Sequence, residues 1–456
     1  MRSPRFAVQF SFLAAAVWTV AAALGEPGPA AAERRAAIEA VMRKMEAATV
    51  AADTAAYTAL IDPTDSEFYH EQVALAKDWT RLKPVSFSLS IVDGKELPAA
   101  VPAPAAAPAE KPAEAPAPAP AEVEKDAPKE KSDKPEQRSP AARSRAQRPQ
   151  SVDVGPAFEP AFDESRAEFR MKTVWKMDGW EQPRTLSVPV VFLRDAQLGW
   201  RYAGEKWDTV VAPAAGAFHG VRVLYEPGNT RHKEIAEKIA AGMPEVRSVV
   251  DTHFKMNTPG VVTIKLYQSM LHLQASVWLG YTDSLGGWNE PRESMKILAR
   301  SSYDGMKKTI AHEYGHCVTF HMGDKATDAP WWVLEGSADL AAATYRGSAA
   351  RARDNAVRGW ASKNELAPWD KIEKFPLPDE YRRFMGHVYT QGEHMMAFID
   401  ARYGTDARIA FLRSLFTGKT TDQASREGLG MPWSDVDAAW RHSVEQQLTT
   451  EPKDDK

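Results

Sequence analysis

Cysteine is almost absent from this sequence of 456 residues, which contains a single one, Cys317. One thiol excludes a disulfide framework, cysteine-based zinc fingers and iron–sulfur clusters, because each of these needs several cysteines in the chain. Any metal chemistry must therefore use histidine and carboxylate side chains.

The chain also lacks an excess of charge of one sign. It has 57 Lys and Arg against 61 Asp and Glu, a formal net charge of −4. Proteins that bind nucleic acid neutralise phosphates with clustered basic side chains, so nucleic acid is not an expected partner. A hydrophobic share of 44% is ordinary for a globular protein, and the length suggests two or three domains.

Long apolar runs are missing except at the N-terminus. Arg2 and Arg5 precede an apolar run over residues 6–24 that ends in small residues. This pattern is typical of a signal peptide, which we predict over residues 1–25. The alternative is an N-terminal membrane anchor, because the run is almost long enough to cross a bilayer. With cleavage, the protein is expected to be exported (periplasmic or secreted), with no membrane span in the mature chain.

Proline and alanine are concentrated in residues 98–150, which hold 12 of the 32 prolines and no aromatic residue. Such a tract cannot bury enough apolar surface to offset its ordering entropy, so we predict a disordered linker. Structured segments are predicted on both sides of it from helical or alternating periodicity. They are helices over 33–50 and 67–79, and strands over 85–91, 166–177, 186–192 and 200–202.

The simplest arrangement joins residues 26–97 and 151–215 into one discontinuous α+β domain, because either fragment alone would be marginally stable. Helices would lie on the concave face of a curved antiparallel sheet. This pattern, with the string Gly-Trp-Arg-Tyr-Ala-Gly over 199–204, resembles the NTF2-like (SnoaL-type) cone fold. Two separate small domains flanking the linker are the alternative. The resemblance implies a cone that often binds small ligands, but no polar cluster here identifies one.

Residues 216–450 are predicted to form a second domain, in which a few strands are followed by helices. Strands are expected over 221–225, 261–267 and 294–299, and a long helix after Asn229 that Pro244 can kink or split. Strands followed by helices predict an α+β domain with a small sheet and a mainly helical C-terminal part. The fold class expected for the whole chain is therefore α+β with two domains.

The string His-Glu-Tyr-Gly-His over 312–316 is the strongest functional signal. On a helix, His312 and His316 lie one turn apart on the same face, so both imidazoles can reach one metal ion. Glu313 is offset by one position and would lie beside the ion, where a water molecule would bind. The alternative is a pair of helix histidines that merely pack against their neighbours.

Glu335 is the candidate third ligand, because eighteen residues separate it from His316 and it lies on a second expected helix over 331–339. Two histidines and one glutamate leave the fourth tetrahedral position open, as a catalytic zinc site requires. One Zn²⁺ per chain is therefore expected. A metzincin site is excluded, because Thr319 and Met322 stand where it needs glycine and histidine.

HEYGH, VLEGSAD over 333–339 and the looser YTQG over 389–392 together resemble the gluzincin metallopeptidases (peptidase MA-like, M1-type). The resemblance implies an enzyme that hydrolyses peptide bonds of a peptide or protein substrate with a metal-bound water. It implies a general-base role for Glu313, a hydrogen bond from a ligand histidine to Asp339, and oxyanion stabilisation by Tyr389. Tyr381 and His387 are competing oxyanion donors.

Several alternatives stay open at this level. The aminopeptidase branch carries a Gly-x-Met-Glu-Asn motif that this chain lacks, and GGWNE over 286–290 stands in a comparable place without matching it. Residues 294–300 are a candidate edge strand on which an extended peptide could pair. The choice between endopeptidase and aminopeptidase is therefore open. There are two non-enzymatic alternatives: a zinc-binding protein without turnover and a scaffold without zinc. The sequence does not indicate an oligomeric state.

Overall fold

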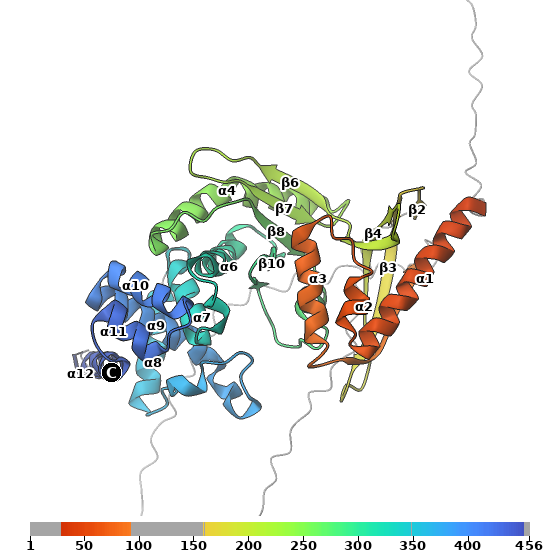
Figure 1. Cartoon of the computed structure of the whole chain (residues 1–456). Helices are drawn as coiled ribbons and strands as arrows, with labels where there is room; N and C mark the ends of the chain where they lie inside the picture. The colour runs from red at the N-terminus through yellow and green to blue at the C-terminus, as the bar shows by residue number, and fades with distance from the viewer. Residues whose placement is uncertain (1–28, 93–157, 159, 348, 451–456) are drawn as a thin grey trace, which may run out of the picture.

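The computed structural model describes residues 29–92, 158, 160–347 and 349–450. The expected signal peptide and the expected linker over 98–150 lie outside the described residues, so both stay predictions. Within the described part, no helix combines the length and the apolar character needed to cross a membrane. The fold is mixed α/β, with two sheets and a mainly helical C-terminal part (Figure 1).

The first sheet is antiparallel and has the strand order β1-β3-β4-β5, with β2 paired to β3. Its strands are β1 (Pro84–Val92), β2 (Ala161–Phe162), β3 (Arg166–Met177), β4 (Arg184–Asp195) and β5 (Gly199–Glu205). Phe87 of β1 pairs with Trp175 of β3. Segments from either side of residues 93–157 therefore lie next to each other in one sheet.

Three helices accompany the first sheet: α1 (Pro29–Ala51), α2 (Thr54–Thr58) and α3 (Ser66–Asp78). On α1, Ile38, Met42 and Met45 recur at helical spacing and are buried in the same apolar cluster as Trp175 of β3. The side chain of Asp65 caps α3 by accepting hydrogen bonds from two backbone N–H groups. Helices thus pack on this antiparallel sheet, while the NTF2-like relationship stays a prediction.

The second sheet has the order β6-β7-β8-β10-β9. Its strands are β6 (Asp208–Ala212), β7 (Val221–Tyr225), β8 (Val262–Tyr267), β9 (Gly287–Trp288) and β10 (Met295–Leu298). β7, β8 and β10 run parallel, whereas β6 and β9 are antiparallel edge strands. Every residue of β8 is buried, as expected for a central parallel strand covered on both faces.

The chain passes from the first sheet to the second between Glu205 and Asp208, because β6 pairs with β7. The domain limit expected at residue 215 stays a prediction. One sequence prediction about this sheet is wrong, since the segment 294–300 is not an edge: β9 pairs with Lys296 and Ile297 of β10. A two-residue strand such as β9 has no periodicity that a sequence pattern could reveal.

The long helix α4 (Thr230–Phe254) covers the second sheet and is capped by the side chain of Asn229. The expected break at Pro244 does not occur, because α4 continues through it. Met243 and Val246, on either side of the proline, are buried in the same core, and this shared packing holds one helix together. Tertiary contacts therefore override the local preference of proline here.

The remaining helices follow β8 in the chain, and the C-terminal ones among them lie at the end of the molecule opposite to α1 in Figure 1. They are α5 (Met270–Val277), α6 (Asp304–Met322), α7 (Trp331–Ala341), α8 (Ala349–Ser362), α9 (Met385–Tyr403), α10 (Thr405–Phe416), α11 (Thr421–Leu429) and α12 (Trp433–Thr450), with short 3₁₀ turns between some of them. α6 packs against α4, α7 and β10, and α7 packs against α9. These contacts bring α6, α7, α9 and β9 around one cleft.

Candidate metal centre

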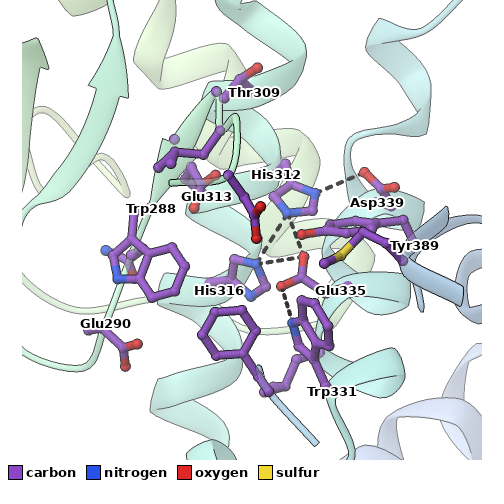
Figure 2. A pocket seen from close by; sticks show the side chains of 18 of the residues that line it. Trp288, Glu290, Thr309, His312, Glu313, His316, Trp331, Glu335, Asp339 and Tyr389 are labelled. Atoms are coloured by element: carbon purple, nitrogen blue, oxygen red, sulfur yellow. Dashed lines mark hydrogen bonds and ion pairs between the residues drawn. The ribbon is translucent and has the colours of Figure 1, made fainter. Parts of the chain in front are cut away.

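Helices α6 and α7 bring the three expected metal ligands together (Figure 2). The Nε2 atoms of His312 and His316 are 3.2 Å apart. The Oε2 atom of Glu335 lies 3.1 Å from Nε2 of His312 and 3.5 Å from Nε2 of His316. The helices can approach this closely because a Cβ atom at Gly315 would lie only 3.1 Å from the Cα atom of Ala338.

These spacings fit a tetrahedral zinc ion. Ligand atoms about 2.0–2.1 Å from a tetrahedral zinc lie about 3.3–3.4 Å from one another. The three observed separations bracket that value, and the donor set of two imidazoles and one carboxylate is one that zinc prefers. The residues present therefore match the group that the sequence predicts.

Asp339 lies one turn after Glu335 on α7 and orients one of the histidines. Its Oδ1 atom is 2.8 Å from Nδ1 of His312. A proton on Nδ1 that is donated to Asp339 leaves the lone pair of Nε2 facing the other ligand atoms. Among the described residues, Nδ1 of His316 has no hydrogen-bond partner, so only His312 receives this support.

Sequence reasoning missed a buried ionic network behind Asp339. Arg346 forms ion pairs with both Asp339 and Glu393, and Arg353 also pairs with Glu393. Glu393 is a residue of α9, so the network joins the helix of Asp339 to the helix that carries Tyr389. Glu393 is 47 residues away from Arg346 in the chain and the members follow no motif, so no sequence signal could have identified the network.

Trp331 packs in the core and also contacts one of the metal ligands. Its side chain is buried, and its indole N–H donates a hydrogen bond of 2.8 Å to Oε1 of Glu335. This bond occupies the carboxylate oxygen that faces away from the histidines and so fixes the Glu335 rotamer. The spacing of four residues on one helix was a usable signal, because residues i and i+4 are neighbours on a helix surface.

The site concentrates negative charge in a buried place. Burial opposes ionisation of Glu335, but His316 and His312 together lower its pKa to about 2. Burial also opposes ionisation of Asp339, but the nearby His312 outweighs it and holds the pKa of Asp339 well below its usual range. Glu313 behaves differently, because burial raises its pKa and the histidines only partly offset this. Three carboxyl groups around two imidazoles make a pocket that favours a cation.

Glu313 lies against the edge strand β9. A Cβ atom at Gly287 would lie 2.7 Å from Cγ of Glu313, so only glycine leaves room for this carboxylate. In Figure 2 the Glu313 carboxylate points toward the His312–His316 pair from the side of β9. A water bound near the pair would therefore lie within its reach.

Tyr389 of α9 lines the same cleft, with its ring centroid 6.3 Å from that of His312. Burial raises the pKa of its hydroxyl well above the usual range, so it stays protonated and can donate a hydrogen bond. The two competing donors do not line this cleft. His387 stacks on Trp360 with ring centroids 3.7 Å apart, and Tyr381 stacks on Phe384.

The cleft has a volume of about 1040 Å³ and also contains Tyr281, a hydroxyl donor that the sequence did not single out. The helix of the two histidines carries Cys317 and His321 as well. Cys317 hydrogen-bonds the Asn289 side chain, and burial raises its thiol pKa. His321 is exposed and contacts a backbone carbonyl of its own helix.

No protein-family model and no curated protein matches this chain. Among solved structures, it is similar to an M1 zinc metallopeptidase from Deinococcus radiodurans, at 17% identity and a TM-score of 0.38, over 64% of this chain and 66% of that one. It is also similar to a mutant of that enzyme with a bound Tyr-Ser-Ala substrate, at 17% identity and a TM-score of 0.37, over 64% of this chain and 66% of that one. This chain therefore covers less than two thirds of their length. The similarity is remote, and the functional conclusion below is drawn from the site's own geometry.

Proposed function

We propose that this chain is a zinc-dependent peptidase that hydrolyses peptide bonds at the His312–His316–Glu335 centre. The observation that carries the proposal is the set of separations among the three ligand atoms, 3.1, 3.2 and 3.5 Å, inside a cleft large enough for a peptide. A bound zinc ion would supply Lewis acidity and lower the pKa of a coordinated water to about 7.

The remaining roles belong to the chain's own side chains. Glu313 accepts the proton of the attacking water and later delivers it to the leaving amine, a role suited to a buried carboxylate with a raised pKa. Tyr389 donates its hydroxyl proton in a hydrogen bond to the developing oxyanion. Asp339 holds His312 in the tautomer that presents Nε2 to the ion. The free edge of β9, next to Glu313, offers backbone groups to an extended substrate.

Replacing Glu313 tests this mechanism. Glu313→Gln should retain stoichiometric zinc, measured by elemental mass spectrometry, while kcat for peptide hydrolysis falls by about 10²–10⁴. Glu380→Gln, an exposed change outside the cleft, is the matched control and should leave kcat unaltered. Undiminished turnover in Glu313→Gln would end the proposal.

The same assay separates the competing functions. A zinc-binding protein without turnover would contain zinc and cleave nothing, and a scaffold would purify without stoichiometric zinc. Internally quenched peptides with blocked and with free N-termini distinguish an endopeptidase from an aminopeptidase. An endopeptidase cleaves both sets, whereas an aminopeptidase cleaves only peptides with a free amine.

Export is the second part of the proposal, and it rests on the N-terminal sequence. Removal of residues 1–25 predicts that the exported chain begins close to Glu26. N-terminal sequencing of the protein recovered from periplasm or medium checks this. An intact N-terminus on a chain that sediments with membranes would instead support the anchor.

A further inference from the structure

Four aromatic side chains form a continuous wall along the cleft. The aromatic wall consists of Tyr281, Trp288, Phe375 and Trp331, all of which line the cleft. Successive ring centroids are 5.9, 5.5 and 4.7 Å apart. These are ordinary distances for interacting aromatic pairs, so the four rings form one surface.

The wall reaches the reacting groups at two of its rings, Trp288 and Trp331. Trp288 directly follows Gly287, which packs against Glu313. Trp331 donates to Glu335, and its ring centroid lies 6.0 Å from that of Tyr389. Figure 2 shows Trp288 and Trp331 on either side of His316. A side chain that lies on the wall would therefore belong to a residue next to the bond being cleaved.

Three of these rings are only half-buried. Tyr281, Trp288 and Phe375 have intermediate exposure, whereas Trp331 is buried. Apolar surface left open in a concave site with a few polar groups is the usual mark of a ligand contact.

The wall is held in place by a second layer of contacts. Trp278 lies behind it, with ring centroids 6.1 Å from Trp288 and 5.8 Å from Phe375. At the exposed rim, Arg382 and Asp283 form an ion pair of 2.5 Å that joins the segment after Phe375 to the segment before Trp288. A preformed surface binds without the entropy loss of ordering its own side chains.

The apolar character of the wall narrows the type of substrate side chain that fits. The cleft is lined by side chains of both charges, including Lys374 and Arg382 as well as Glu290, so its overall charge does not select the side chain. The four rings disfavour a charged side chain, because a charged group that lies on apolar surface loses hydration. Glu290, which lies next to Trp288 in Figure 2, further disfavours a carboxylate. A large neutral side chain therefore fits the wall best.

We infer that the aromatic wall is a specificity subsite that binds a large apolar side chain, preferably aromatic, on a substrate residue flanking the scissile bond. This inference rests on the proposed peptidase function, because it assigns a substrate class to that cleft.

Two series of internally quenched peptides test the inference on the full-length chain. In each series one residue, either before or after the cleavable bond, is Phe, Tyr, Leu, Ala or Glu. We expect kcat/KM for Phe and Tyr to exceed that for Ala by roughly 10–100-fold in one series, with Glu below Ala. Trp288→Ala and Phe375→Ala should bring the Phe-to-Ala ratio close to one. Trp288→Phe should retain most of the preference.

Phe162→Ala, which removes a half-buried ring from the first sheet, is the matched control and should leave the ratio unchanged. Equal rates for all peptides, or an unchanged ratio in both alanine variants, would overturn the inference and leave the peptidase proposal standing. If the wild type cleaves no peptide, the proposed function fails, and binding decides the inference. Labelled Phe and Ala peptides are then titrated onto Glu313→Gln by fluorescence anisotropy, and equal affinities would reject the subsite.

Discussion

At the scale of single residues, the centre depends on side chains that hold the metal ligands in place. Asp339 accepts a hydrogen bond from His312, and Trp331 donates one to Glu335. Each contact fixes a ligand rotamer before any ion binds, so less conformational entropy is lost on binding. Helical spacing brings these side chains to one face of α7, because Trp331, Glu335 and Asp339 lie on successive turns.

Removing the acceptor at Asp339 should weaken metal binding. In Asp339→Asn the His312 tautomer is no longer fixed, and we expect the zinc dissociation constant to rise by about 10–100-fold. Titration against a chromophoric chelator measures this. Asp328→Asn, at an exposed position on the cleft rim, should leave affinity unchanged. Equal affinities for Asp339→Asn and wild type would show that Asp339 does not orient the ligand.

The oxyanion role of Tyr389 predicts a loss in kcat without a comparable change in KM. A hydrogen bond made only in the transition state contributes about 10²–10³ in rate, and Tyr389→Phe removes that donor while retaining the ring. Steady-state kinetics on one peptide measure both constants. Tyr281→Phe serves as the comparison, because Tyr281 is the other tyrosine that lines the cleft. A larger loss of kcat in Tyr281→Phe would transfer the role to that residue.

At the scale of secondary structure elements, the packing of α7 on α9 sets the distance between the ligand Glu335 and Tyr389. Gly336 and Gly392 face each other where the helices meet, and a Cβ atom on either would collide with backbone atoms of the opposite helix. Each glycine lies within three positions of a site residue. The close approach therefore sets the width of the cleft at its reacting end.

Adding one methyl group at this crossing should separate the two helices. We expect Gly392→Ala to lower the free energy of unfolding by about 1–3 kcal/mol and to reduce kcat further than the fraction of folded protein explains. Denaturant unfolding and kinetics on the folded fraction measure the two effects. Gly386→Ala on the same helix, where a Cβ atom meets nothing within 4 Å, should be neutral or slightly stabilising. Normal activity in Gly392→Ala would contradict this role for the crossing.

At the scale of the whole molecule, a buried carboxylate joins the two sheets. Glu71 of α3 forms an ion pair with Lys265 of β8 and accepts a hydrogen bond of 3.1 Å from the backbone N–H of Ser294, next to β10. Trp175 of β3 adds an indole hydrogen bond of 2.9 Å to the carbonyl of Leu279. The first sheet is thereby attached to the strands that lead to the cleft.

Neutralising Glu71 should loosen this attachment. Glu71→Gln leaves Lys265 buried without its carboxylate, and we expect the free energy of unfolding at pH 7 to fall by about 3–5 kcal/mol. Urea denaturation followed by fluorescence measures the change. Glu39→Gln breaks a solvent-exposed ion pair with Arg35 on α1 and should change stability by less than about 1 kcal/mol. Equal effects of the two substitutions would exclude a special role for the buried pair.

The pH dependence of the same two proteins gives a second check. Burial opposes ionisation of Glu71, but Lys265 and Lys296 lower its pKa below the usual value. Its stabilising contribution is therefore complete above the unfolded pKa of about 4.3 and is lost as the pH falls through the lower folded value. The wild type should lose more stability than Glu71→Gln on acidification across that window. If the free energy of unfolding fell equally with pH in the two proteins, the lowered pKa would not belong to Glu71.

The sequence by itself determined the parts of this protein that depend on local spacing. The four-residue interval between His312 and His316, and that between Glu335 and Asp339, place each pair on one helix face whatever the surroundings are. Alternation likewise predicted β1, β3, β4 and β8, because apolar residues recur at alternate positions in each strand.

Only the tertiary structure decided which of these elements meet. It placed β6 in the second sheet, kept α4 unbroken at Pro244, and made β9 rather than β10 the edge beside Glu313. It also assembled the aromatic wall and the Arg346–Glu393 network from segments distant in the chain. Such contacts arise from packing and charge pairing across the fold, which impose no regular spacing on the sequence, so no pattern along the chain could predict them.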